Sequence, residues 1–310
     1  MVQAPQFSWR FLLPNYWLLW LGAALLWLVS WLPYSVLMAI GAGFGRLLHN
    51  SLKSRRNVAR RNIELCFPTM PAAEQAALVK HNFEETGKAL FDTIIGWWWP
   101  NWRIRKLAHF NGYEHIQSAV AEGKGVLLLA AHFLHLEAAG RVFGLTHPSV
   151  GFYRPHNNPL MDYLQYHGRI KANKYMVGKR DVKGLVAALN QQEVCFYLPD
   201  QDYGRNRSEF VPFFAVADAA TTTGTLLFAN AANCVVIPVV TSRLEGNRGY
   251  QVDVLPKLAQ FPSGDDKADV TKVNQWVEQA VLRHPEQYMW LHRRFKTRPD
   301  ATAASLYKRG

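Results

Sequence analysis

An uncharged stretch near the N-terminus limits the fold more than any other feature of the sequence. No Asp, Glu, Lys or Arg occurs between Arg10 and Arg46, and residues 16–34 read YWLLWLGAALLWLVSWLPY. A helix of about 20 apolar residues crosses the hydrocarbon core of a bilayer, and Trp and Tyr collect at its two interfaces. We therefore expect a membrane-spanning helix over residues 16–34, within an N-terminal anchor of residues 1–45. The pattern leaves open whether residues 35–45 enter the membrane.

Only basic residues follow this stretch until the first acidic one, Glu64: Arg46, Lys53, Arg55, Arg56, Arg60 and Arg61. Basic residues flank the cytoplasmic side of membrane helices and attract anionic lipid head groups. We therefore expect residues 46–310 to form a cytoplasmic domain. A cleaved signal peptide would have a shorter apolar region and a small-residue cleavage site. A buried core helix is the other alternative.

Composition narrows the class of protein further. The chain has 310 residues, is 49% hydrophobic and 13% aromatic, and carries a formal net charge of +12. It can bury a sizeable core, and its charge favours nucleic acid, an anionic membrane or an anionic substrate as partner. Its three cysteines, Cys66, Cys195 and Cys234, form no CxxC pair. A disulfide framework or a thiolate zinc site is therefore not expected, and a reducing compartment fits better.

Downstream of residue 125, apolar runs typical of buried strands alternate with runs of helical periodicity. This alternation predicts an α/β fold, with a mixed, mostly buried sheet that helices cover on both faces. The expected strands are residues 125–131, 149–155, 193–199, 234–243 and 249–256. The expected helices are residues 72–95, 133–145, 159–172, 182–190, 221–233 and 270–285.

Two histidines and a glutamate stand where the strand 125–131 meets the following helix: His132, His135 and Glu137. Residues five apart on one helix do not face each other, but from the strand end His132 can turn back toward the first helical turn. Glu137 would then orient the imidazole, and His132 would act as a general base. A polar rim on a core helix is the alternative, whereas the HExxH pattern of zinc enzymes is absent. His135 cannot face Glu137 and is expected to be structural.

Two further strand ends carry charged groups. Arg154 leaves the strand at 149–155, and Asn158 and Arg169 follow it. Such guanidinium and amide groups suit the recognition of phosphate or carboxylate. Asp200 and Asp202 follow the strand at 193–199, where they could bind a metal, pair with the two arginines or form a turn. Ligand sites in open α/β sheets lie at the carboxyl ends of strands, so we expect these groups to converge.

Two aromatic segments have open interpretations. Residues 97–102 read WWWPNW and suit either the core or a surface that meets lipid. The tail at 284–299 is basic and aromatic, which favours nucleic acid when taken alone. On a membrane-anchored enzyme, contact with anionic lipid or an acidic carrier protein explains the tail as well.

Taken together, these segments resemble the late acyltransferases of lipid A biosynthesis. The matching motifs are NIELCFP, HFLHLE, YRPHNNPLMD, LPDQDYG, FFAV, TTTGT and PEQYMWLHRRFKTRP, in this order along the chain. The resemblance covers nearly the whole chain and is greater to the lauroyl and palmitoleoyl branch than to the myristoyl branch. It extends to the wider glycerolipid acyltransferase group, whose His-x4-Asp/Glu motif His132 and Glu137 match.

The resemblance implies a glycerolipid acyltransferase-like fold and an enzyme at the bacterial inner membrane, held by a single-pass anchor with its catalytic domain in the cytoplasm. The expected reaction moves an acyl chain from acyl carrier protein to a hydroxyl on a 3-hydroxyacyl chain of Kdo2-lipid IVA. His132 is then the general base and Glu137 its partner. The substrate-binding residues would be Arg154, Asn158, Arg169 and Asp200. No cofactor, no metal and no nucleic acid are implied.

Three other functions remain open at this point. A lysophospholipid or glycerol-phosphate acyltransferase would use the same dyad on a small lysolipid. A lipid hydrolase would place water, instead of a lipid hydroxyl, at His132. A membrane-tethered protein that binds lipid or nucleic acid would use His132 only structurally.

Overall fold

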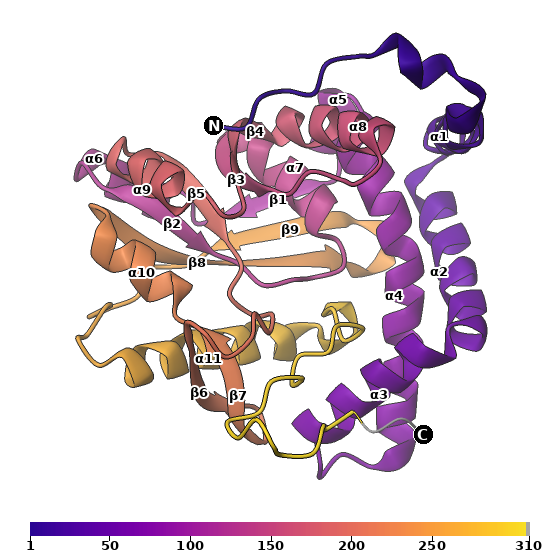
Figure 1. Ribbon diagram of the computed structural model, residues 1–310. Helices are drawn as coiled ribbons and strands as arrows, with labels where there is room; N and C mark the ends of the chain where they lie inside the picture. Colours follow the sequence, from indigo (N-terminus) through magenta and orange to yellow (C-terminus); the bar gives the residue numbers. More distant parts are fainter. Residues whose placement is uncertain (308–310) are drawn as a thin grey trace.

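A seven-stranded sheet lies at the centre of the computed structural model, which describes residues 1–307 (Figure 1). Its strands run in the spatial order β1-β9-β8-β2-β5-β3-β4. They are β1 (Ala108–Asn111), β2 (Gly125–Leu129), β3 (Ser149–Tyr153), β4 (Asn173–Gly178), β5 (Val194–Tyr197), β8 (Cys234–Leu244) and β9 (Gly249–Val254). Strands β6 (Ser208–Phe213) and β7 (Val216–Thr222) pair separately as an antiparallel hairpin.

The large sheet is mixed, as predicted. Strand β2 is parallel to both of its neighbours, β5 and β8, and β3 is parallel to β4 and β5. Strand β9 then runs antiparallel to β8, and β1 runs parallel to β9. The five strands from β8 to β4 therefore end at one common edge, and this arrangement places their carboxyl ends together.

Helices cover both faces of the sheet, which confirms the predicted layers. Every residue of β2 is buried, and its side chains alternate between two hydrophobic clusters because successive residues of a strand point to opposite faces. Val126 and Leu128 pack with α4 (Ala72–Trp98), α6 (Tyr113–Ala121) and α7 (Leu136–Thr146). On the other face, Leu127 and Leu129 pack with α9 (Val182–Asn190), α10 (Gly224–Ala231) and α11 (Asp266–Arg283).

The predicted spanning helix at 16–34 is wrong. Helix α1 (Trp17–Val29) has 13 residues, after which the chain turns and starts α2 (Tyr34–Ser51) behind Pro33. At about 1.5 Å of rise per residue, α1 is shorter than the roughly 30 Å core of a bilayer. Among residues 1–307, no helix has both the length and the apolar character that a membrane crossing requires.

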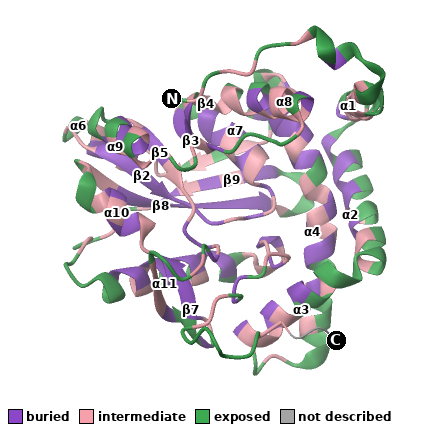
Figure 2. Cartoon of the chain, viewed as in Figure 1, coloured by how far each residue is buried: buried purple, intermediate pink, exposed green. Residues whose placement is uncertain are grey.

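The boundary predicted at residue 45 falls inside α2, which packs along α4 (Figure 1). Two glycines allow this close approach. A Cβ on Gly45 would lie 2.1 Å from the carbonyl oxygen of Phe83, and one on Gly87 would lie 2.1 Å from that of Gly41. Residues 34–51 are therefore part of the body of the protein, while the outward faces of α1 and α2 are exposed (Figure 2).

Most predicted elements are present, but one helix was misplaced. The segment at 221–233 was expected to be a helix capped by threonine, yet Thr221 and Thr222 end β7 and α10 starts at Gly224. Strands β1 and β4, the β6–β7 hairpin and helices α3 (Lys53–Cys66), α5 (Asn101–Arg105) and α6 were not predicted. The remaining helix is α8 (Pro159–Arg169), with short 3-10 turns at Trp9–Leu12, Pro14–Tyr16, Ile170–Ala172, Glu245–Asn247 and Pro285–Gln287.

Candidate active site

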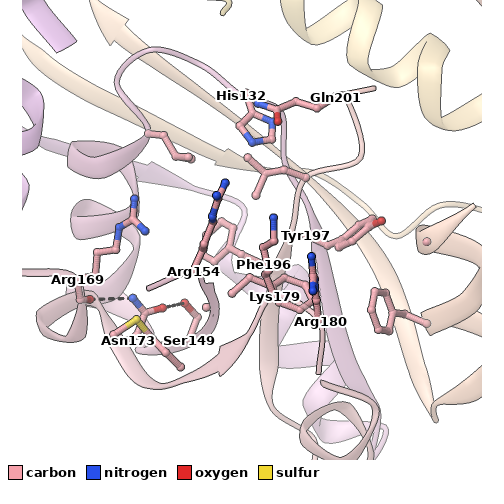
Figure 3. Close-up of a pocket in the computed structure, with 18 of the residues that line it drawn as sticks. His132, Ser149, Arg154, Arg169, Asn173, Lys179, Arg180, Phe196, Tyr197 and Gln201 are labelled. Carbon is pink, nitrogen blue, oxygen red and sulfur yellow. Dashed lines mark hydrogen bonds between the residues drawn. The ribbon is translucent and has the colours of Figure 1, made fainter. Parts of the chain in front are cut away.

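A cavity of about 850 Å³ opens at the carboxyl ends of β2, β3, β4 and β5 (Figure 3). This is the edge of an open parallel sheet where ligand sites are expected. Four of the predicted side chains line it: His132, Glu137, Arg154 and Arg169. Its wall also contains apolar side chains, among them Trp97 and Phe228.

The imidazole of His132 is held by Asp200. Strands β2 and β5 are neighbours with Leu129 opposite Tyr197, and His132 and Asp200 each lie three residues beyond these partners. The backbone N–H of His132 donates to Oδ2 of Asp200 at 2.8 Å, and Nδ1 of the imidazole lies 2.6 Å from Oδ1. The pairing of the strands thus brings the two side chains together across 68 positions of sequence.

The Asp200 carboxyl is buried, with 1% of its surface exposed. Burial alone would raise its pKa, but the charge of His132 and the hydrogen bonds from His132 outweigh burial and lower the pKa below its usual value. An ionised carboxylate only accepts hydrogen bonds, so Nδ1 carries the proton. The opposite nitrogen, Nε2, is then free to accept a proton on the side of the cavity (Figure 3).

The predicted pairing of His132 with Glu137 is therefore corrected. Helix α7 starts at Leu136, so Glu137 lies in its first turn and faces α4 and α8. The carboxylate of Glu137 accepts hydrogen bonds from Nε1 of Trp97 at 2.9 Å and from Nε of Arg169 at 2.9 Å. His132 precedes the helix by four positions and turns toward the end of β5 instead. Both side chains line one cavity, but the orienting carboxylate is that of Asp200.

His135 is structural, as predicted. Its side chain is fully buried, stacks on the ring of Phe133 and hydrogen bonds through Nε2 with the hydroxyl of Thr241 at 3.0 Å. Burial lowers the pKa of its imidazole to about 3, so it is neutral at physiological pH.

Arg154 and Asn158, both predicted to bind substrate, have different positions. Arg154 is exposed at the mouth of the cavity, directly after β3. Asn158 does not line the cavity, because its side-chain oxygen accepts from the backbone N–H groups of Leu160 and Met161 at the start of α8. An Asn before Pro159 is a typical helix N-cap, and this signal was available in the sequence.

Asp202 is not a partner of the arginines either. Both the backbone N–H and the hydroxyl of Thr297 donate to its carboxylate at 2.8 Å, which ties the C-terminal tail to the turn after β5. Residues 1–307 contain no cluster of three His, Cys, Asp or Glu side chains that could hold a metal ion. The aspartates of this turn therefore position His132 and the tail.

The basic aromatic tail and the Trp-rich segment are largely internal. Trp290 is buried, and the guanidinium of Arg294 is buried against the carbonyl of Ala220 and the hydroxyl of Thr221. In the segment at 97–102, Trp97 lines the cavity, Trp99 donates to the carbonyl of Ser30 and Trp102 is exposed. Each of these segments thus contributes mainly to the core.

Sequence reasoning missed two cavity residues, Lys179 and Arg180. They follow β4 just as Arg154 follows β3, and their side chains extend into the space below His132 (Figure 3). The sequence signal for them was weak, because β4 (NKYMVG) has too few apolar residues to be recognised as a strand.

Comparison with known proteins identifies the family of this chain. The profile of the bacterial lipid A biosynthesis acyltransferase family matches residues 4–297. The chain is 45% identical to the lipid A biosynthesis lauroyltransferase of Escherichia coli (strain K12), over 97% of this chain and 98% of the relative. It is 41% identical to the palmitoleoyltransferase of that organism, over 97% and 98%. Its identity to the myristoyltransferase of that organism is 28%, over 95% and 91%.

The two most similar of these relatives match nearly end to end, and the family profile spans both the N-terminal helices and the residues that line the cavity. The resemblance seen in the separate motifs is thereby confirmed across the chain. The protein belongs to the bacterial lipid A biosynthesis acyltransferase family and is an acyltransferase.

Proposed function

We propose that this enzyme transfers a fatty acyl chain from acyl carrier protein to the hydroxyl of a 3-hydroxyacyl chain of Kdo2-lipid IVA. The single observation that carries the proposal is the hydrogen bond from Nδ1 of His132 to the buried Asp200 carboxylate, which directs Nε2 toward a large, partly apolar cavity. The names of the relatives support lipid A acylation, and 45% and 41% identity to a lauroyl- and a palmitoleoyltransferase supports the first of the late acylations.

In the proposed step, Nε2 of His132 removes the proton of the acceptor hydroxyl. The hydroxyl oxygen attacks the thioester carbonyl carbon, and the tetrahedral adduct collapses to an ester. The departing thiolate takes the proton back from the imidazolium, so the histidine returns to its starting form. Base catalysis of this kind contributes about 10²–10⁴-fold, and positioning of the two substrates contributes more.

Glu137 and Arg169 have a different role in this proposal. Their ion pair, with Trp97, closes the side of the cavity between α4, α7 and α8. Glu137 keeps the guanidinium of Arg169 in place beside the reacting groups. Arg169 then stabilises negative charge that develops on the carbonyl oxygen, which preorganised donors do efficiently in a partly desolvated site.

We also propose that the enzyme works on the inner membrane of a bacterium with its catalytic domain in the cytoplasm. The support is the α1 face, which we define as Leu18, Leu21, Leu25 and Leu28. These leucines repeat at helical spacing and are each more than half exposed. A contiguous exposed apolar surface of this kind marks an interaction site, and a lipid acceptor makes a bilayer the matching partner.

The test combines purified protein with Kdo2-lipid IVA and acyl carrier proteins loaded with lauroyl, palmitoleoyl or myristoyl chains. Mass spectrometry should detect one added acyl group on the acceptor. A parallel reaction with lysophosphatidate should give no product. Absence of any mass gain with every donor would refute the transfer reaction, and acylation of lysophosphatidate alone would favour a lysophospholipid acyltransferase.

His132→Ala should reduce turnover about 10²–10⁴-fold while leaving the fold intact. His81→Gln is the matched control, because His81 is an exposed residue of α4 outside the cavity. If His132→Ala turned over like the wild type, the general-base assignment would be wrong even with the reaction confirmed.

A further inference from the structure

Three cations stand side by side at the mouth of the cavity: Arg154, Lys179 and Arg180, which we call the cation rim. Strands β3 and β4 are parallel neighbours, with Tyr153 opposite Gly178. The next residue of each strand is cationic, and the backbone N–H of Lys179 donates to the carbonyl of Tyr153 at 2.9 Å. The register of the sheet therefore fixes the backbones that carry these charges.

Within residues 1–307, no acidic side chain forms an ion pair or hydrogen bond with the cation rim. Arg169, which also lines the deep cavity, is by contrast paired with Glu137. The acid next to the rim, Asp181, caps α9 by accepting from the backbone N–H of Gly184 at 2.8 Å. Positive charge thus collects at this edge without a direct ion pair to an acidic side chain, which favours an anionic ligand.

The cation rim also separates two hollows. All three residues line both the deep cavity, about 850 Å³, that contains His132 and a shallower one of about 540 Å³ on the outside. Figure 3 shows the nitrogen-bearing ends of Arg154, Lys179 and Arg180 directed into the space beneath His132. A ligand with an anionic group at the rim can therefore keep its apolar part inside and its polar part outside.

We infer that the cation rim binds a phosphate ester of one of the two substrates. Two guanidinium groups and one ammonium match the chemistry of phosphate, since guanidinium binds its oxygens in pairs and ammonium adds a point charge. This inference rests on the proposed function, which supplies two sources of such a group. One is a sugar phosphate of the acceptor lipid, and the other is the phosphate of the carrier protein's phosphopantetheine arm.

The test variant is Lys179→Gln with Arg180→Gln, which leaves the residues around His132 in place. Its control is Arg105→Gln with Lys183→Gln, which removes the same charge from two exposed residues outside both hollows. Equilibrium binding is measured in detergent for two ligand pairs: Kdo2-lipid IVA against its enzymatically dephosphorylated form, and phosphopantetheine against pantetheine. Thermal unfolding of each variant checks the fold, with the single variant Arg180→Gln replacing the double one if the latter unfolds.

The wild type and the control should bind the phosphorylated member of one pair more tightly, and the rim variant should lose about tenfold in affinity for that member alone. The pair that responds identifies the source of the phosphate. Equal affinity of the wild type for both members of both pairs would overturn the inference, even if acyl transfer occurs. A phosphate preference that depends on the rim, in a protein without transfer activity, would uphold this inference and refute the proposed function instead.

Discussion

At the scale of single residues, Asp200 decides which nitrogen of His132 would act as the base in the proposed reaction. Its ionised carboxylate accepts from Nδ1, so the lone pair of Nε2 is directed to the cavity. The second carboxylate oxygen accepts from the backbone N–H of His132 and thereby fixes both the side chain and its main chain. One buried acid therefore sets both the tautomer and the position of His132.

Asp200→Asn tests this assignment. The amide can donate to Nδ1, which moves the imidazole proton to Nε2 and removes the base from the cavity, with the shape of the site almost unchanged. We expect turnover to fall about 10³–10⁴-fold at a nearly constant KM. Steady-state kinetics on the lipid acceptor measures this, and Asp218→Asn, at an exposed position of β7, is the control. A fall in activity below tenfold would show that tautomer control is unimportant.

His135 makes a prediction about stability and pH. Burial lowers the pKa of its imidazole to about 3 from an ordinary 6.5, so protonation favours the unfolded chain. The stabilisation that the neutral imidazole gives the folded protein is complete above about pH 6.5 and is lost as the pH falls toward 3. Proton linkage predicts that the free energy of unfolding falls by about 2 kcal/mol between pH 6.5 and pH 5. His135→Gln cannot titrate, so its unfolding free energy should fall less over this interval.

Denaturant unfolding of both proteins at pH 6.5 and pH 5 supplies the comparison, and only the pH-dependent change is compared. His81→Gln serves as control and should follow the wild type, because His81 is exposed. If the unfolding free energies of the wild type and His135→Gln fell by the same amount, His135 would not be the titrating group.

At the scale of elements, the C-terminal tail joins the helices to the His132 loop. Asn82 on α4 donates to the carbonyls of Glu286 and Tyr288 at 2.8 and 2.7 Å, and Asn62 on α3 does the same for Trp290 and His292. The tail in turn bonds the loop: Met289 N–H donates to the carbonyl of His132 at 3.0 Å. Two asparagines of α3 and α4 that do not line the cavity thus help to position His132.

Asn82→Leu removes both donors and leaves two carbonyls of the tail unsatisfied. We expect it to destabilise the protein by about 2–4 kcal/mol and to reduce kcat more than it raises KM, because the His132 loop loses support. Asn274→Leu is the matched control, since Asn274 is equally buried but bonds Pro212 and Thr221 near the hairpin. It should lower stability without changing the kcat of the folded enzyme, and a similar fall of kcat in both variants would contradict the positioning role.

Some of the helices and strands could be predicted from the sequence and others could not. Strand β2 and helix α9 follow from continuous apolar runs and helical periodicity, which are local properties. The β6–β7 hairpin was missed because VADAATT has little apolar alternation and its threonines suggested a helix cap. The spanning helix failed because composition over a window does not register the turn before Pro33.

In the site, too, the local features could be predicted and those that depend on packing could not. His132 and Arg154 were identified because each follows a recognisable strand. The pairing of His132 with Asp200 was not, because it depends on β2 and β5 being neighbours, and neighbours in a sheet are chosen by packing across the whole domain. Glu137 was nearer in sequence, yet the direction of α7 turns its carboxylate to Arg169.

At the scale of the whole molecule, α1 lies at the periphery (Figure 1), its C-terminal end is held to the body, and the leucines of the α1 face are exposed. Arg103 holds that end: its guanidinium donates to the carbonyls of Ser30 and Trp31 and stacks 3.6 Å over the ring of Trp99. The orientation of α1 relative to the cavity is therefore defined, and a lipid surface on the α1 face would lie on a fixed side of the active site.

This geometry makes the last prediction. Leu21→Asn should weaken the binding of the protein to phospholipid vesicles about tenfold, since the free energy of burying one leucine side chain is of that order. Leu282→Asn is the matched control: the exposed fractions of Leu21 and Leu282 are 67% and 58%, but Leu282 lies on α11. Vesicle co-sedimentation at several salt concentrations measures both, and the leucine effect should persist at high salt because apolar burial is not screened. Neither change should affect acyl transfer to an acceptor dissolved in detergent. An equal loss of vesicle affinity in the two variants would show that the α1 face has no special part in membrane binding.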